Sequence, residues 1–250
     1  MALSKNKIQE IRKLHQKKFR EELKLFLVEG TKSVSDLLAS GLHVREILAT
    51  ESWVTRHSAL CGKADITILS RAEMDRISML TAPQEVIAVV ATPHFEVTDI
   101  NPAQPLLVLD DIRDPGNLGT ILRTADWFGV LQVLCSASTV EVTSPKVIQA
   151  TMGSFTRVKV IYSDLSQYLD SIAGNRRILG TFMSGSHIGD IRFCAGDILI
   201  IGNETNGISP EIAMRVTDRV HIPATCHTVS HAESLNASVA AGIAMFCWMG

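Results

Sequence analysis

Short apolar segments alternate with amphipathic ones along nearly the whole chain. The apolar segments have the length of β-strands and cover residues 25–30, 44–50, 64–70, 86–92, 106–112, 130–136, 158–163, 177–183, 197–203 and 219–224. Helical spacing covers residues 32–41, 71–80, 117–129 and 165–173, and further helices are expected after Ser144, after Ser209 and from about Ala232. Strands that alternate with helices predict an α/β fold with a mostly parallel sheet.

The first 25 residues have a different pattern, that of a basic amphipathic helix. Apolar residues recur at close to helical spacing at Ile8, Ile11, Leu14, Phe19 and Leu23. Eight basic and three acidic side chains accompany them, so the segment carries a formal charge of +5. Such a helix either exposes a solvated face or binds a polyanion.

A proline-containing segment divides the chain. Residues 92–105 include three prolines, and we place a boundary near residue 98, with domains at 1–98 and 99–250. The formal net charge of −2 is the sum of +2 in the first domain and −4 in the second. The near-neutral total therefore does not exclude an anionic partner. Aromatic residues make up only 5% of the chain, which disfavours a base-stacking surface.

Compartment signals are few. The longest apolar runs are strand-sized, well short of the roughly 20 residues that span a bilayer, and the basic start lacks the features of a secretory signal. Five cysteines are scattered without a CxxC pair. We expect a cytoplasmic protein with reduced thiols and no membrane segment.

Three segments of the second domain carry polar residues where strands meet helices. In residues 107–129, a turn ends at Asn117, a candidate helix cap, and Arg123 follows in the second helical turn. In residues 198–210, an aliphatic strand runs into Gly202 and Glu204, and a helix is expected at Ser209-Pro210. Glycine at a strand end lets a ligand approach the backbone closely.

The third segment, residues 220–246, joins a strand to a helix of small residues that begins near Ser234 and Asn236. Local pattern alone leaves both as candidate caps. Glu204 is equally open, as a functional acid or a partner of the helix dipole. The dinucleotide fingerprint GxGxxG is absent after the first strand of this domain.

Together, the motifs NLGTILRTA, GNETNGIS and IP followed by ESLNASVAAGI resemble those of the SpoU (TrmH-type) family of RNA 2′-O-ribose methyltransferases. The resemblance covers roughly residues 105–248, and residues 3–92 resemble the family's N-terminal substrate-binding domain. It implies a C-terminal parallel-sheet α/β domain with a deep trefoil knot, a small N-terminal α/β (α+β) RNA-binding domain, and a homodimer formed through the C-terminal domain.

The resemblance also implies the site. S-adenosylmethionine is expected at Gly202, Ile222 and Leu235, without a metal. The expected catalytic set is Arg123, Asn117, Glu204, Ser234 and Asn236. The family assigns proton removal from the ribose hydroxyl to Arg123, but an arginine is normally always charged, so a grip on the RNA phosphate is the physically easier alternative. Expected RNA contacts are Arg12, Lys13, Lys17, Lys18 and Arg20, and ribosomal RNA is favoured over transfer RNA.

Two rival functions remain open. An inactive RNA-binding or assembly factor could use the same scaffold. Asp110, Asp111 and Asp114 allow a metal-dependent hydrolase, although strand-end carboxylates usually have structural roles. Cys226, His227 and His231 have metal-like spacing but lack an evident fourth ligand. We expect that segment to be a loop near the RNA.

Overall fold

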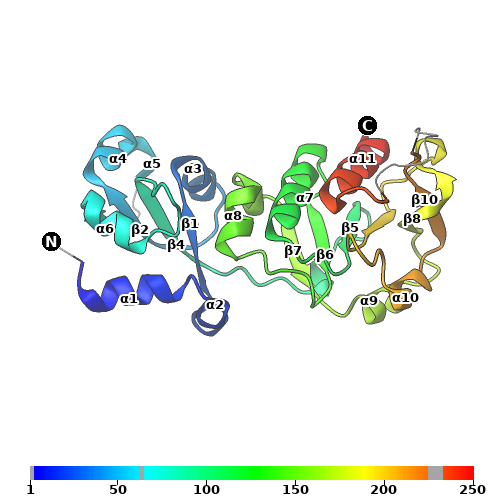
Figure 1. The fold of residues 1–250 in the computed structure, drawn as a ribbon, viewed down its shortest axis with the longest axis horizontal. Helices are drawn as coiled ribbons and strands as arrows, with labels where there is room; N and C mark the ends of the chain where they lie inside the picture. The colour runs from blue at the N-terminus through cyan, green and yellow to red at the C-terminus, as the bar shows by residue number, and fades with distance from the viewer. Residues whose placement is uncertain (1–2, 62–64, 225–232) are drawn as a thin grey trace. The chain divides into compact units, whose positions relative to one another are not determined.

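The computed structural model describes residues 3–61, 65–224 and 233–250. Its contacts divide the chain into two compact units (Figure 1). Unit 1 comprises Met1–His94 and Glu141–Thr156, and unit 2 comprises Phe95–Val140 and Arg157–Gly250. The first division lies a few residues before the boundary placed at 98, but the sequence pattern did not indicate that Glu141–Thr156 belongs with unit 1.

Unit 2 contains a six-stranded sheet in the order β10-β8-β9-β5-β6-β7. Every strand pairing in it is parallel, which confirms the expected α/β class. Its strands are β5 (Leu106–Leu109), β6 (Gln132–Cys135), β7 (Lys159–Tyr162), β8 (Ile178–His187), β9 (Ile198–Ile201) and β10 (Asp218–His221). The central strands β5 and β9 are buried throughout, as strands covered on both faces should be.

The helices of unit 2 are α7 (Pro115–Phe128), α9 (Leu165–Ser171), α10 (Pro210–Ala213) and α11 (Ala237–Met249). Helices α7 and α11 pack side by side in Figure 1. The last helix begins at Ala237, not at about Ala232 as predicted, because Asn236 caps it by accepting bonds from the amides of Ser238 and Val239. The predicted start of α10 at Ser209-Pro210 is confirmed.

Unit 1 contains a four-stranded mixed sheet in the order β1-β4-β2-β3. Its strands are β1 (Leu25–Glu29), β2 (Val44–Thr50), β3 (Ile66–Leu69) and β4 (Val86–Ala91). Its helices are α1 (Lys5–Lys13), α2 (Lys17–Leu23), α3 (Thr31–Ala39), α4 (Glu51–Arg56), α5 (Ser58–Cys61), α6 (Arg71–Ile77) and α8 (Pro145–Thr151). The sequence pattern missed α4 and α5, which are short and lack an apolar repeat.

The basic N-terminal segment is two helices and not one. The apolar repeat explains the break: Ile8, Ile11 and Leu14 are buried at helical spacing, but the next apolar residue, Phe19, comes five positions later. A spacing of five lies off the face that a continuous helix buries. The chain therefore leaves the helix after Lys13 and begins again at Lys17.

Segment Glu141–Thr156 completes the core of unit 1. Ile148 and Phe155 lie in one apolar cluster with residues of β1, β2 and β4, and the rings of Phe26 and Phe155 meet edge to face at 6.1 Å. Glu141 forms an ion pair with Arg20. The expectation that Arg20 contacts RNA needs correction, because its side chain is buried and Nη1 donates to the carbonyl of Leu14 at 2.8 Å.

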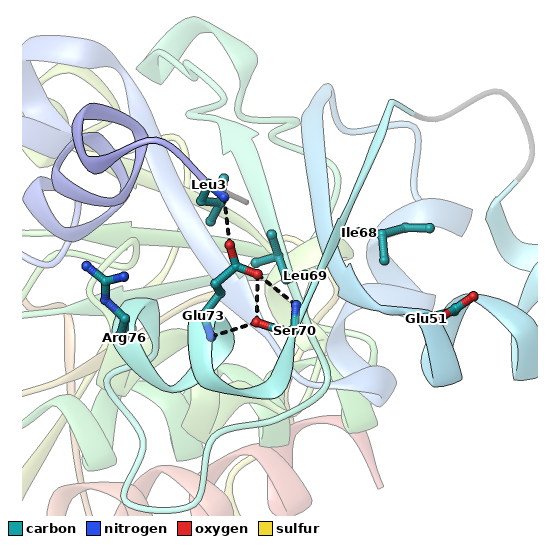
Figure 2. Close-up of a pocket in the computed structure, with 7 residues that line it drawn as sticks. All are labelled: Leu3, Glu51, Ile68, Leu69, Ser70, Glu73 and Arg76. Atoms are coloured by element: carbon teal, nitrogen blue, oxygen red, sulfur yellow. Dashed lines mark hydrogen bonds between the residues drawn. The ribbon is translucent and has the colours of Figure 1, made fainter. Parts of the chain in front are cut away.

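An open cavity of about 650 Å³ lies on unit 1 (Figure 2). Its polar centre is Glu73, whose carboxylate accepts hydrogen bonds from the hydroxyl and amide of Ser70 at 2.7 and 2.9 Å and from the amide of Leu3 at 2.6 Å. The Ser70 side chain in turn accepts from the amide of Glu73, which completes a capping box at the start of α6. Glu73, Ser70 and the Leu3 amide therefore satisfy one another within the cavity.

The Glu73 contacts predict a pH-dependent stability. Hydrogen bonds from the Ser70 side chain, the Ser70 amide and the Leu3 amide lower the pKa of Glu73 from 4.5 to about 2. A depressed carboxyl pKa stabilises the fold at pH values above 4.5, and this stabilisation disappears as the pH falls towards 2. We expect Glu73→Gln to lower the melting temperature by about 2–4 °C at pH 7, because the neutral amide loses the charge-assisted hydrogen bonds and the favourable negative charge at the start of α6.

Thermal unfolding of both proteins from pH 7 to pH 3 measures this effect, with Glu51→Gln as the matched control. Glu51 lines the same cavity, but within the described residues its carboxylate accepts no hydrogen bond. The difference between wild type and Glu73→Gln should shrink as the pH falls. A difference that stays constant with pH would contradict the prediction.

None of the helices in the described ranges combines the length and the hydropathy that a membrane span requires.

Candidate functional site

The polar segments of unit 2 meet beyond the carboxyl ends of its parallel strands. Strands β5 and β9 are neighbours in register, so the residues that follow them, Asp110 and Gly202, emerge at the same edge of the sheet. Helix α7 begins after β5, and residues 202–207 form a tight loop after β9. In open α/β sheets this edge is where ligands bind.

A chain of hydrogen bonds joins the three segments. The Asn117 side-chain amide donates to the carboxylate of Glu204, and the amide of Asn236 donates to Oδ1 of Asn117 at 2.9 Å. The Ser234 hydroxyl lies 3.5 Å from the carbonyl oxygen of Glu204, a long contact. Four of the five expected catalytic residues, which lie up to 119 positions apart in the sequence, are thus brought together.

Asn117 is available for this chain because another residue caps the helix. Asp114, and not Asn117 as predicted, is the N-cap of α7, and its carboxylate accepts from the backbone amide of Asn117 at 2.8 Å. Pro115 then occupies the first helical position, where the missing amide hydrogen costs nothing. The Asn117 side chain therefore points to Glu204 and not to its own backbone.

The loop after β9 is shaped by its own backbone. A β-carbon on Gly202 would lie 2.2 Å from the carbonyl carbon of Gly207, so only glycine fits there. Contact within the loop is therefore one reason for a glycine at this position, and the expected approach of a ligand to its backbone stays a prediction. The side chain of Asn203 holds the tip of this loop, because its Oδ1 accepts hydrogen bonds from the backbone amides of Thr205 and Asn206 at 2.9 and 3.2 Å.

Arg123 is separate from this chain of bonds. Its side chain is exposed and forms no hydrogen bond or ion pair within the described residues. It lies six positions after Asn117, which is about 9 Å along the axis of α7. Because Trp127 follows four positions later, the two side chains share one face of the helix. The guanidinium is thus available to bind a ligand or a partner outside unit 2.

The remaining expected residues flank the same edge. Ile222, half-buried, follows β10 directly, and Leu235, exposed, precedes the cap of α11. Cys226, His227 and His231 lie outside the described residues. Among the described residues, no group of three or more His, Cys, Asp or Glu side chains could hold a metal ion.

The three aspartates after β5 have separate structural roles. Buried Asp110 accepts from the amide of Ser209 at 2.8 Å, and Asp114 caps α7. Asp111 accepts from Nε of Arg113 at 2.9 Å. These contacts do not support the hydrolase alternative. Asn203 and Arg113 were not among the residues predicted from the sequence. The one sequence signal was that Asn203 directly precedes Glu204 in the motif GNETNGIS.

Both units of the chain are similar to known proteins. Residues 104–246 match the SpoU rRNA Methylase family, and residues 5–88 match the MRM3-like substrate binding domain. The chain is 30% identical to the Bacillus subtilis 23S rRNA (guanosine(2553)-2′-O)-methyltransferase RlmP, over 96% of this chain and 94% of that protein.

Solved structures are similar over nearly the whole chain. A TrmH-family structure from Porphyromonas gingivalis has a TM-score of 0.88 and 34% identity and covers 99% of this chain and 98% of that one. The AdoMet-bound rRNA methyltransferase from Sinorhizobium meliloti has a TM-score of 0.87 and 28% identity, with 99% and 95% covered. The family match covers more than half of the chain, and the matched range contains all three segments that form the site. The chain therefore belongs to the SpoU rRNA methylase family.

Proposed function

We propose that this protein transfers a methyl group from S-adenosylmethionine to a ribose 2′-hydroxyl of ribosomal RNA. The observation that carries the proposal is the hydrogen-bonded chain Asn236–Asn117–Glu204, which joins one residue from each of the three motifs. The name of the Bacillus relative specifies a 2′-O-methylated guanosine of 23S rRNA, which favours ribosomal over transfer RNA.

The residues at the sheet edge fit an adenosyl donor. Gly202, Ile222 and Leu235 would hold it, and half-buried Ile222 and exposed Leu235 offer apolar surface to it. When bound, the donor supplies a methyl group on a positively charged sulfur, which leaves as a neutral thioether. The family resemblance predicts that the chain forms a trefoil knot around this donor site.

The residues of this chain then have to position the ribose 2′-hydroxyl and assist the loss of its proton. Its oxygen bonds to the methyl carbon as the carbon–sulfur bond breaks, and its proton passes to water or a phosphate. We propose that Arg123 grips the adjoining RNA phosphate and polarises the hydroxyl, because a guanidinium stays protonated in proteins. Glu204, Asn117, Ser234 and Asn236 would keep the loops in place around the reacting atoms.

Unit 1 would bind the RNA through its basic helices. Arg12, Lys13, Lys17 and Lys18 are exposed on α1 and α2. The ammonium groups of Lys13 and Lys18 lie 5.4 and 5.9 Å from the centre of the Phe19 ring, which gathers two cations at the bend between the helices. Such a cluster favours phosphate contact over base stacking.

We further propose a homodimer formed through α7 and α11. Helix α11 buries one apolar face in unit 2 and leaves a second apolar stripe exposed, at Val239, Phe246 and Met249. Trp127 of the adjacent helix α7 is 84% exposed. A helix that is apolar all round is normally covered, so a second copy would cover this face. Arg123 borders it, and the partner would then help to enclose the site.

Methyl transfer from labelled S-adenosylmethionine to ribosomal RNA tests the proposed function. The 2′-O-methyl sites of rRNA from cells with and without the protein would identify the nucleotide. Loss of one site in the deleted strain, together with transfer in vitro, is the expected result. RNA binding without donor binding or transfer would instead favour the assembly factor. The cytoplasmic location expected from the sequence suits a ribosomal substrate.

A further inference from the structure

The backbone of Asp111 is held in an unusual conformation at the edge of the parallel sheet. Its φ angle is +60°, in the left-handed region that residues other than glycine, asparagine and aspartate rarely adopt. Two neighbouring loops hold it there. Its amide donates to Oγ of Ser136 at 2.9 Å, and its carbonyl accepts from Nδ2 of Asn203 at 2.8 Å. The backbone of Asp111, from which its carboxylate extends, is therefore held by the segments that follow β5, β6 and β9.

This carboxylate orients Arg113. Nε of Arg113 donates to Oδ1 of Asp111 at 2.9 Å, while the Arg113 side chain is 70% exposed and that of Asp111 only 18%. In the described part of the chain, Arg113 makes no other ion pair or side-chain hydrogen bond. An ion pair with so exposed a member adds little stability. The contact uses only Nε, so the four donors of the two terminal nitrogens are left for a ligand.

Arg113 is anchored to the two loops that carry the hydrogen-bonded chain. It directly precedes Asp114, the cap of the helix on which Asn117 lies. Asn203, which holds the Asp111 carbonyl, directly precedes Glu204. The guanidinium is therefore positioned by the same framework as the Asn117–Glu204 bond, but it extends into solvent.

We propose that Arg113 binds a backbone phosphate of the substrate RNA beside the target ribose and that Asp111 is its positioning residue. The inference rests on the proposed function. Paired terminal nitrogens of arginine match the oxygens of a phosphate. The carboxylate of the methyl donor has similar chemistry, but exposure at the rim favours a large ligand that covers Arg113 on binding.

Salt dependence of RNA binding provides the test. We expect Arg113→Ala to weaken binding of an rRNA fragment containing the target nucleotide by about tenfold at moderate salt. The slope of log affinity against log salt concentration should fall by about 0.7–0.9, the value for one lost phosphate contact. The affinity for S-adenosylmethionine, measured by calorimetry, should stay within about twofold. Arg113→Lys should keep the slope but recover only part of the affinity.

Arg192→Ala is the matched control, since it removes the same charge from an exposed position of unit 2. Asp111→Asn retains a residue tolerant of the left-handed region and removes only the charge that orients Arg113. It should weaken RNA binding less than Arg113→Ala and add nothing to that variant.

Equal effects of Arg113→Ala and Arg192→Ala on RNA affinity and salt slope would overturn the proposal. So would a loss confined to donor affinity, which would assign Arg113 to the donor carboxylate. Failure of the proposed function is distinguishable, because it would appear in the wild-type protein as absent methyl transfer. RNA binding by the same protein would still report on Arg113.

Discussion

Replacing Arg123 with alanine should lower the rate of methyl transfer by about 10²–10⁴-fold without unfolding the protein. The rate effect is that of removing a group that stabilises the reacting hydroxyl. The fold should tolerate the change because the side chain is exposed and has no partner within the described residues. Single-turnover transfer to ribosomal RNA and thermal unfolding measure the two quantities.

The same variant separates the two roles open to Arg123. A phosphate grip predicts that RNA affinity falls together with the rate, and that Arg123→Lys restores part of both because it keeps the charge. A base predicts a loss of rate alone, with RNA affinity unchanged. Arg192→Ala, which removes an exposed arginine elsewhere in unit 2, controls for the charge and should leave the rate intact. Transfer at the wild-type rate by Arg123→Ala would remove Arg123 from the mechanism.

Replacing Phe246 with arginine should convert the protein to a monomer and reduce methyl transfer at least tenfold. Phe246 is 63% exposed in a single chain, so its own unit should accept the change. At a covered interface, an unpaired cation costs several kcal/mol, which raises the dimer Kd by more than 100-fold. Sedimentation equilibrium and a transfer assay on the same samples measure both effects.

Met214→Arg controls for an added charge on an exposed apolar position, because Met214 is 79% exposed at the end of α10, away from α7 and α11. It should remain dimeric and active. If dimerisation completes the site, the activity of Phe246→Arg per chain should also rise with protein concentration. A wild-type protein that sediments as a monomer at micromolar concentration would refute the dimer proposal.

Local sequence patterns determined most of the fold. Strands β5 and β9 are runs of aliphatic residues, which only a covered strand can accommodate, and Ser209-Pro210 has the chemistry of a helix start. The three motifs likewise gave the candidate residues, because the resemblance rests on residue identity and spacing. These features depend on neighbours within a few positions, which a sequence displays directly.

Only the tertiary structure decided how those residues are used. Arg20 and Lys17 are both basic residues of the same N-terminal segment, and the sequence does not distinguish them. Arg20 is buried against Glu141, more than a hundred positions away, while Lys17 is exposed. The Asn117 side chain donates a hydrogen bond to Glu204, and Asp114 is the residue that caps α7. The orientation of Arg113 depends on Asp111, whose backbone is held by the ends of two other strands. Hydrogen bonds and burial arise from proximity in space, and parallel strands bring together residues that the sequence keeps far apart.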